Sequence, residues 1–460
     1  MKILTDRYIY YLLIIFLITI PFINPYLRGD GNGYYAYIRS IIIDRDLEFS
    51  NEYEQANQKF KDHPSVWGKA PTGLIQNIYP VGSSLLWSPF FLSTHLVTKV
   101  LNLSGFKIPP DGYSPPYLRL VAFGSAFYAF VGLLLIYSIC RKYFPKDVVL
   151  LAIVLIWFAS SLPVYMYLLP FYAHANALFT TSLFIFVWIK TRGEKNKIKW
   201  FILGITGGLM VLVRYESVVF LLIPLFDILT RIKMSGRKFI HLELIGLGVF
   251  CIGLLAALTP NFIIKKLLYG SFLETGYETF GWLPSLKIFS VLFSSKHGIF
   301  TWTPILLFAT GGFFLFFKKD KRFALYLAIP YILLVYIVGC WPNWWQGSSF
   351  GGRIFISCTP LFVLGLAALI EFLRKTVSLK IISVIGFFFI VWNFLFIFQF
   401  GWGLIPREDY ISWKKIVYNQ VFVVPPEIIR IAKIYLFDRE NFKVLIEERE
   451  AIQREKGLQY

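Results

Sequence analysis

The side chains best suited to do chemistry stand at the edges of long apolar runs. Asp30 lies between glycines in "RGDGNGYYAYIR" (28–39), directly after the first apolar run. A carboxylate at such an edge could orient and deprotonate a hydroxyl group. Gly31 and Gly33 permit backbone conformations and close approaches that a side chain would prevent. We therefore take Asp30 as the candidate catalytic residue.

A second interpretation of Asp30 is purely structural. A short helix lying in the headgroup zone is expected after Asn32, because one helical stripe carries Tyr34, Tyr37, Ile38, Ile41 and Ile42. Asp30 or Asn32 could simply cap that helix. A calcium loop is excluded, because glycine is absent at its sixth position and Ile41 stands at its twelfth.

Cationic side chains beside small-residue turns are suited to grip a phosphate through charge and backbone N–H groups. The candidates, in order of preference, are Arg353, Lys296, Arg214 and His297. They lie in "WPNWWQGSSFGGRIF" (341–355), "SSKHGIFTWTP" (294–304) and "VLVRYES" (211–217). The alternative is that these side chains only snorkel to lipid headgroups.

Aromatic and polar side chains near the same edges could hold a sugar or an acceptor. They are Tyr34, Tyr35, His174, Asn343, Trp344, Trp345 and Gln346. Tryptophans at a membrane edge commonly serve as belt anchors instead. His174 has an equally plain alternative, an interfacial histidine without a ligand.

The composition requires a membrane environment for the elements that position these residues. Hydrophobic residues make up 57% of the 460 residues and charged residues only 16%, whereas a soluble surface needs about a quarter charged residues. The net charge of +19 would suggest nucleic acid in a soluble protein. Here the basic residues sit in short loops between apolar runs, where they set topology. Nucleic acid is therefore not expected as a partner.

Basic clusters alternate with loops that are almost free of Lys and Arg, and the positive-inside rule assigns the basic loops to the cytoplasm. The clusters are Lys2 with Arg7, Arg141 to Lys146, Lys190 to Lys199, Arg231 to Lys238, Lys318 to Arg322 and Arg374 to Lys380. This pattern predicts an all-α integral membrane protein with about eleven spans. They are expected near 8–26, 117–140, 148–165, 172–190, 199–213, 217–231, 241–263, 299–317, 323–340, 355–373 and 381–400.

The apolar stretch 78–100 would invert every later basic loop if it crossed the membrane. Its prolines and its polar Ser and His residues also fit poorly with a lipid-exposed span. We predict an interfacial or re-entrant segment, so that 27–116 forms a large first outer loop. The first apolar run, which lacks a small-residue cleavage site, is expected to be a retained helix.

The four cysteines show no metal-binding spacing. All lie in or beside apolar segments, where a free cysteine behaves as a small hydrophobic residue. Cys340 and Cys358 flank one loop and could form a disulfide if that loop is extracytoplasmic.

Four stretches together resemble the bacterial relatives of the GT-C glycosyltransferases. They are "RGDGNGYYAYIRSIIIDRDLEF", "YPVGSSLLWSPFF", "HGIFTWTP" and "SFGGRIF". That superfamily includes protein O-mannosyltransferases and lipid A aminoarabinose transferases. The resemblance runs from about residue 5 to 400, and the first outer loop is its most specific part.

The resemblance implies a bundle of membrane helices that transfers a sugar from a polyprenyl-phosphate donor. The acceptor would be a protein, a lipid or a glycan at the outer face of the cytoplasmic membrane. Residues 1–400 would form the catalytic domain and 401–460 an outer-face, solvated tail. By position, Asp30 corresponds to the catalytic acidic residue at the start of the first outer loop. Many members carry a paired acidic motif there, whereas Gly31 follows Asp30, so a divalent metal is possible but not assured.

Two other functions are compatible with a multi-span protein. A transporter or flippase of a lipid-linked sugar should carry ionisable residues near the middle of its spans, and the expected spans are nearly free of them. An O-antigen polymerase or ligase would place its basic residues in a large late loop, whereas the largest loop here is the first. Polar residues concentrated on one membrane face favour the interfacial enzyme.

Overall fold

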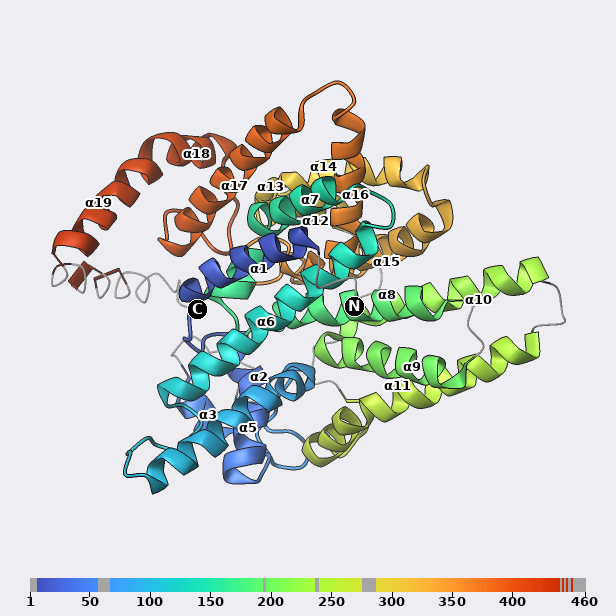
Figure 1. Ribbon diagram of the computed structural model, residues 1–460. Helices are drawn as coiled ribbons and strands as arrows, with labels where there is room; N and C mark the ends of the chain where they lie inside the picture. The colour runs from blue at the N-terminus through green and yellow to red at the C-terminus, as the bar shows by residue number, and fades with distance from the viewer. Residues whose placement is uncertain are drawn as a thin grey trace.

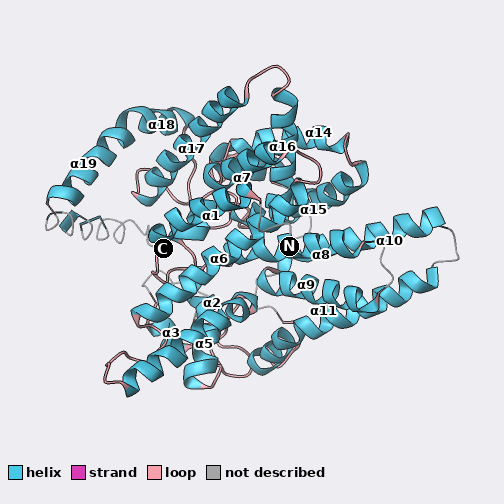
Figure 2. Cartoon of the chain, viewed as in Figure 1, coloured by secondary structure: helices cyan, strands magenta, loops and turns pink. Residues whose placement is uncertain are grey.

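The computed structural model describes residues 6–56, 67–192, 196–235, 240–274 and 287–438, together with residues 441, 444–445 and 448–449. Within these ranges the chain is built from helices and connecting loops, without a β-strand (Figures 1 and 2). The predicted all-α class is confirmed.

The helices follow the predicted apolar segments closely. Their bounds are α1 Arg7–Thr19, α2 Asp30–Arg39, α3 Ser50–Glu54, α5 Gly82–Leu103, α6 Pro115–Cys140, α7 Lys146–Ala159, α8 His174–Thr191, α9 Lys197–Val213, α10 Leu222–Ser235, α11 Ile240–Tyr269, α12 Ile288–Phe293, α13 Ile299–Trp302, α14 Ile305–Phe317, α15 Lys321–Cys340, α16 Thr359–Leu373, α17 Leu379–Gly401, α18 Trp413–Tyr418 and α19 Val424–Phe437.

Five described helices are long and apolar enough to cross a membrane. They are Pro115–Cys140, Glu243–Tyr269, Lys321–Cys340, Arg353–Leu373 and Leu379–Gly401. Arg7–Phe22 and Ile305–Phe317 are shorter apolar helices. The chain is therefore a multi-pass membrane protein, although the predicted count of eleven spans is not confirmed.

Proline interrupts two of the predicted spans. The span expected at 299–317 is divided into α13 and α14, because the chain leaves helical geometry at Thr303 before Pro304. The first span, expected to reach residue 26, ends as a helix at Phe22 after a turn that contains Pro21.

The stretch 78–100 folds largely as the continuous helix α5, which packs along α6. Trp87 Nε1 donates to Ser125 Oγ at 2.7 Å, and His95 Nδ1 lies 2.7 Å from the Tyr117 hydroxyl. Of the polar side chains that spoke against a lipid-exposed span, His95 faces α6 and Ser84 donates to the Tyr34 backbone oxygen of α2. Its position on the outer face stays a prediction.

The predicted first outer loop (27–116) packs through α2, α3 and α5 into two apolar clusters that it shares with helices of the bundle (Figure 1). Arg39 ties it together by donating to Asp44 and, at 2.8 Å, to Glu52. Its Nε donates to the backbone oxygen of Asp111 at 3.1 Å. Acidic residues of this loop thus serve its folding.

The possible disulfide is not formed. Cys340 and Cys358 are both buried free thiols. Cys340 ends α15, whereas Cys358 ends the 3₁₀ turn before α16, and each packs in the helix bundle.

The predicted boundary at residue 400 is followed by chain that packs on the bundle. Ile405, Ile411 and Ile416 belong to its main apolar core. The helix expected in "NFKVLIEEREAIQREKG" (441–457) lies mostly outside the described residues.

Candidate active site

Asp30 is the first residue of α2. The glycines on either side of it allow aromatic side chains to pack closely against this part of the chain. Gly29 has φ +47°, and a Cβ atom there would lie 2.1 Å from the Tyr172 hydroxyl oxygen. A Cβ atom on Gly31 would lie 2.7 Å from the Cβ atom of Phe171. The glycines are thus required by close packing against the 171–172 segment.

The Asp30 carboxylate makes an ion pair across the molecule. Its Oδ2 atom lies 2.6 Å from Arg353 Nη1, and the Tyr79 hydroxyl donates to Oδ1 at 3.4 Å. The Asp30 side chain is 26% exposed, so solvent or a substrate can reach it. It does not cap α2, because the capping position is Gly29 and no side chain caps there. Asn32 instead donates to the Gly29 oxygen at 3.0 Å.

Arg353 begins the 3₁₀ turn Arg353–Cys358, directly after two glycines. Gly351 has φ +62°, which lets the chain turn sharply into this element. The guanidinium carbon lies 5.5 Å from the Tyr172 ring centroid, and the Arg353 side chain is only 12% exposed. A cation is thus held in the turn that precedes α16, against an aromatic face and the Asp30 carboxylate.

Arg214 lies in the same region, at the end of α9. Its Nε atom donates to Glu216 at 2.6 Å, and its Nη1 atom donates to the Tyr34 hydroxyl at 3.0 Å. The Tyr34 ring lies 4.9 Å from that of Tyr79. Tyr34 and Tyr79 therefore connect the Arg214 guanidinium to the Asp30 carboxylate.

Tyr79 was not singled out from the sequence, although it lies in the quoted "YPVGSSLLWSPFF" stretch. A Cβ atom on Gly33 would clash with its ring, and Tyr37 donates to its backbone oxygen at 3.0 Å. Asn77 Nδ2 donates to the Gly33 oxygen at 2.8 Å, and Lys265 Nζ donates to the Asn77 oxygen at 3.2 Å. The segment that presents Tyr79 is thus held by both α2 and α11.

His174 stands at the start of α8 and is buried. Its ring lies 4.8 Å from Tyr165 and 6.5 Å from Tyr172. Its Nε2 atom has no hydrogen-bond partner among the described residues. Tyr172 also contacts Arg353, so the imidazole shares an aromatic neighbour with the ion pair. It stays a candidate for sugar or acceptor binding.

Two of the predicted phosphate-binding residues, Lys296 and His297, contact groups other than Asp30. Lys296 Nζ lies 3.6 Å from the Trp345 ring centroid. His297 stacks on Trp302 at 4.3 Å, and its Nε2 atom bonds the backbone oxygen of Arg407. Burial lowers the pKa of His297 to about 4, with help from the charges of Lys296 and Arg353. A neutral imidazole at neutral pH supplies no positive charge to a phosphate.

The predicted sugar-binding residues of the 341–354 loop have structural neighbours. Gln346 Oε1 accepts from the Ile354 backbone N–H at 2.9 Å, and Trp344 is buried with its ring edge against Trp345. Asn343 is exposed. A Cβ atom on Gly347 would lie 3.8 Å from Arg353 Nη2, so this loop borders the Arg353 guanidinium.

Tyr35 is part of the core of the first outer loop. It is fully buried, donates to the Gly112 oxygen and contacts the rings of Phe91 and Phe171. Its hydroxyl therefore has a structural partner, whereas that of its neighbour Tyr34 faces Arg214.

The donor set around Asp30 does not fit a divalent metal. The carboxylate faces a guanidinium and a phenol, and no second carboxylate contacts it. Within the described ranges, no three His, Cys, Asp or Glu side chains gather as a metal site.

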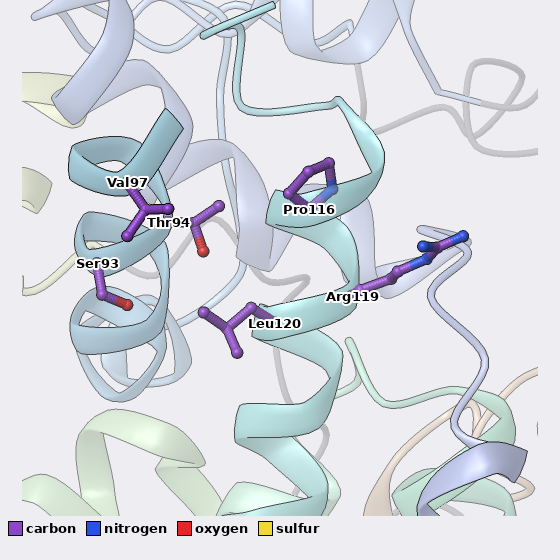
Figure 3. A pocket seen from close by; sticks show the side chains of 6 residues that line it. All are labelled: Ser93, Thr94, Val97, Pro116, Arg119 and Leu120. Carbon is purple, nitrogen blue, oxygen red and sulfur yellow. The ribbon is translucent and has the colours of Figure 1, made fainter. Parts of the chain in front are cut away.

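A separate apolar groove lies between α5 and α6, with a volume of about 390 Å³ (Figure 3). It is lined by Ser93, Thr94, Val97, Pro116, Arg119 and Leu120. The Arg119 side chain points away from the facing helix in Figure 3. The groove therefore offers no charged group, and the candidate site stays at Asp30.

Comparison with known proteins supports the resemblance read from the sequence. Residues 118–259 match the family model described as dolichyl-phosphate-mannose-protein mannosyltransferase. This range includes His174 and Arg214 but neither Asp30 nor Arg353. The match covers less than half of the chain and agrees with the resemblance to GT-C-type membrane glycosyltransferases.

Among solved structures, the chain is similar to archaeal oligosaccharyltransferase AglB from Archaeoglobus fulgidus, in complex with an inhibitory peptide and a dolichol-phosphate. The identity is 13% and the TM-score 0.43, over 93% of this chain and 54% of that chain. The chain thus spans about half the length of that protein. A search of the curated proteins finds no match.

Proposed function

We propose that this protein is a membrane glycosyltransferase that moves a sugar from a polyprenyl-phosphate donor to an acceptor hydroxyl. The reaction takes place at the outer face of the cytoplasmic membrane, and Asp30 is the general base. The observation that carries the proposal is the partly exposed Asp30 carboxylate, paired with Arg353 and adjacent to Tyr79. The family match of residues 118–259 supports the class of reaction.

The two charges of the ion pair suit the two demands of glycosyl transfer. The acceptor oxygen attacks the anomeric carbon, and its proton passes to Asp30. The bond from that carbon to the phosphate oxygen breaks, and the electron pair leaves with the lipid phosphate. Direct displacement inverts the configuration at the anomeric carbon.

Arg353 and Arg214 are the cations suited to the leaving phosphate. A guanidinium in a partly water-excluded site stabilises developing negative charge more strongly than it would in water. Each is paired with a carboxylate in this structure, Arg353 with Asp30 and Arg214 with Glu216. Bound donor phosphate would share these guanidinium groups with the carboxylates, which would leave Asp30 free to accept a proton.

The test compares wild type with Asp30→Asn in sugar transfer from polyprenyl-phosphate donors, at matched membrane expression. Asparagine keeps the size of the side chain but cannot act as a base, so kcat should fall by at least ~100-fold. Asp409→Asn, at an exposed outer carboxylate, is the matched control and should retain full activity. Full activity of Asp30→Asn would refute the catalytic role. If wild-type protein moves a lipid-linked sugar across the bilayer of vesicles but transfers no sugar to an acceptor, the result would instead support a flippase.

A further inference from the structure

The chain after α17 buries amide side chains against α17 and exposes apolar side chains. Asn419 Nδ2 donates to Gln399 Oε1 at 3.0 Å, and Gln420 Nε2 donates to the Trp392 oxygen at 3.0 Å. Both amides are buried against α17. The face of this segment that packs on the protein therefore combines two amides with the apolar side chains of Ile416 and Val424.

The opposite face of the same segment is apolar and exposed. It consists of Val417 (45% exposed), Tyr418 (57%), Val421 (54%) and Phe422 (64%), which we call the outer apolar face. A helix surrounded by water places its apolar residues inside and its polar residues outside. Here the exposed face is apolar while two amides lie on the buried face, as expected for a helix whose surroundings are hydrocarbon.

The outer apolar face lies beside a helix that can span the membrane. Trp392, the partner of Gln420, precedes the end of α17 at Gly401 by about nine residues, or ~14 Å along the helix axis. The window of α17 that can span the membrane is itself mostly exposed. In Figure 1, α18 and α19 lie along α17, on the other side of the bundle from α9 and α11.

Basic and aromatic side chains frame this face, as is typical of a membrane interface. Lys414 and Lys415 are exposed on α18, beside the half-exposed Trp413. Trp402, directly after α17, donates through Nε1 to Glu427 of α19 at 3.0 Å. This bond places the start of α19 level with the end of α17. Lysine beside apolar residues can extend its ammonium group to lipid phosphates.

We propose that residues 413–437 bind the outer leaflet of the bilayer as a re-entrant element. The outer apolar face contacts lipid acyl chains, and the flanking lysines contact phosphate headgroups. This element is a lipid-binding surface and not a water-solvated tail, and the proposal does not depend on the enzymatic activity. Its partner is phospholipid, because a protein partner would not account for the depth of the segment beside α17.

The test is spin-label accessibility of the full-length protein in phosphatidylethanolamine–phosphatidylglycerol nanodiscs. A nitroxide is placed on Phe422→Cys, and on Asp409→Cys as the exposed control, in a Cys251→Ser background. Cys251 is the exposed native cysteine, and the other native cysteines are buried. Relaxation is measured with lipid-soluble oxygen and with a water-soluble nickel complex.

We expect oxygen to relax the label at position 422 at least ~3-fold more strongly, relative to nickel, than the label at position 409. Equal nickel access at both positions would refute the proposal, because the segment would then lie in water. Protection of position 422 from both reagents would also overturn it, because another protein would then cover the face. Gel filtration of both labelled variants is the control for folding, and both should give the profile of the unlabelled protein.

Discussion

Single side chains decide whether the Asp30 carboxylate can work as a base. Asp30 draws its geometry from Arg353 and Tyr79, which come from parts of the chain far away in sequence. Arg353 holds the carboxylate by charge, whereas Tyr79 holds it by a hydrogen bond to the other oxygen. Loss of either partner should therefore affect the orientation of Asp30 before it affects the fold.

Replacement of Tyr79 by phenylalanine should lower kcat by about threefold to tenfold with little change in KM for the donor. The substitution keeps the ring packed on Tyr34 and Gly33 but removes a hydrogen bond that, at 3.4 Å, is weaker than the ~1.5–3 kcal/mol typical of one to a charged group. Steady-state transfer kinetics measure the effect, with Tyr410→Phe at an exposed position as the control. An unchanged kcat would show that Arg353 alone orients Asp30.

At the scale of the elements, an ion pair between α2 and α3 stabilises the part of the predicted first outer loop that carries Asp30, which we call the platform. Helix α2 carries Asp30 at one end and Arg39 at the other. Glu52 from α3 contacts Arg39, while its second oxygen is buried and has no hydrogen-bond partner among the described residues. The platform therefore depends on a carboxylate that is buried but only half satisfied.

This arrangement predicts a pH-dependent stability. Burial raises the pKa of Glu52 to about 7, although Arg39 opposes the shift. Because folded Glu52 keeps its proton to higher pH than the unfolded chain does, stability is highest below about pH 5 and declines as pH rises through 7. Glu52→Gln should flatten this decline and raise the melting temperature at pH 8 by a few degrees.

Thermal unfolding at pH 5, 6.5 and 8 tests the role of Glu52. Glu54→Gln is the matched control, because Glu54 lies on the same helix but is exposed. If Glu52→Gln and wild type show the same pH dependence, the decline arises from other groups. His297 acts in the opposite direction, since its lowered pKa costs stability only as pH falls below about 6.5.

At the scale of the whole molecule, the outer loop must keep a defined position on the helix bundle. Lys265 of α11 is 1% exposed and reaches the Asn77 oxygen in the loop. It thereby links the membrane helices to the segment that presents Tyr79. A buried ammonium is costly unless it is hydrogen-bonded, so this contact restricts the relative position of the two parts.

Lys265→Met should loosen this connection while it keeps most of the apolar contact of the side chain. We expect faster proteolysis in the first outer loop and at least a fivefold fall in kcat, with the helix bundle still folded. Lys266→Met is the neighbouring control, because Lys266 is exposed and bonds only the nearby Gly270 oxygen. Equal protease resistance of both variants would contradict the coupling.

The sequence by itself determined the membrane class, the all-helical fold and Asp30 as the residue of interest. These features follow from composition, from apolar run length and from glycines beside a lone carboxylate, all of which are local. The positive-inside pattern also placed most helix ends within a few residues. Several spans were shortened or divided where hydrophobicity suggested continuous helices, at Pro21, at Pro304 and after Ala159.

Only the tertiary structure decided which cation meets Asp30. Arg353, Lys296 and Arg214 were all candidates, with Arg353 preferred; in the structure Arg353 pairs with Asp30, whereas Lys296 rests on Trp345. Tyr79 was missed because a tyrosine in an apolar stretch carries no local sign of its long-range partner. Such pairings depend on how helices distant in sequence pack, because the energy of an ion pair or hydrogen bond is set by the final separation of its atoms.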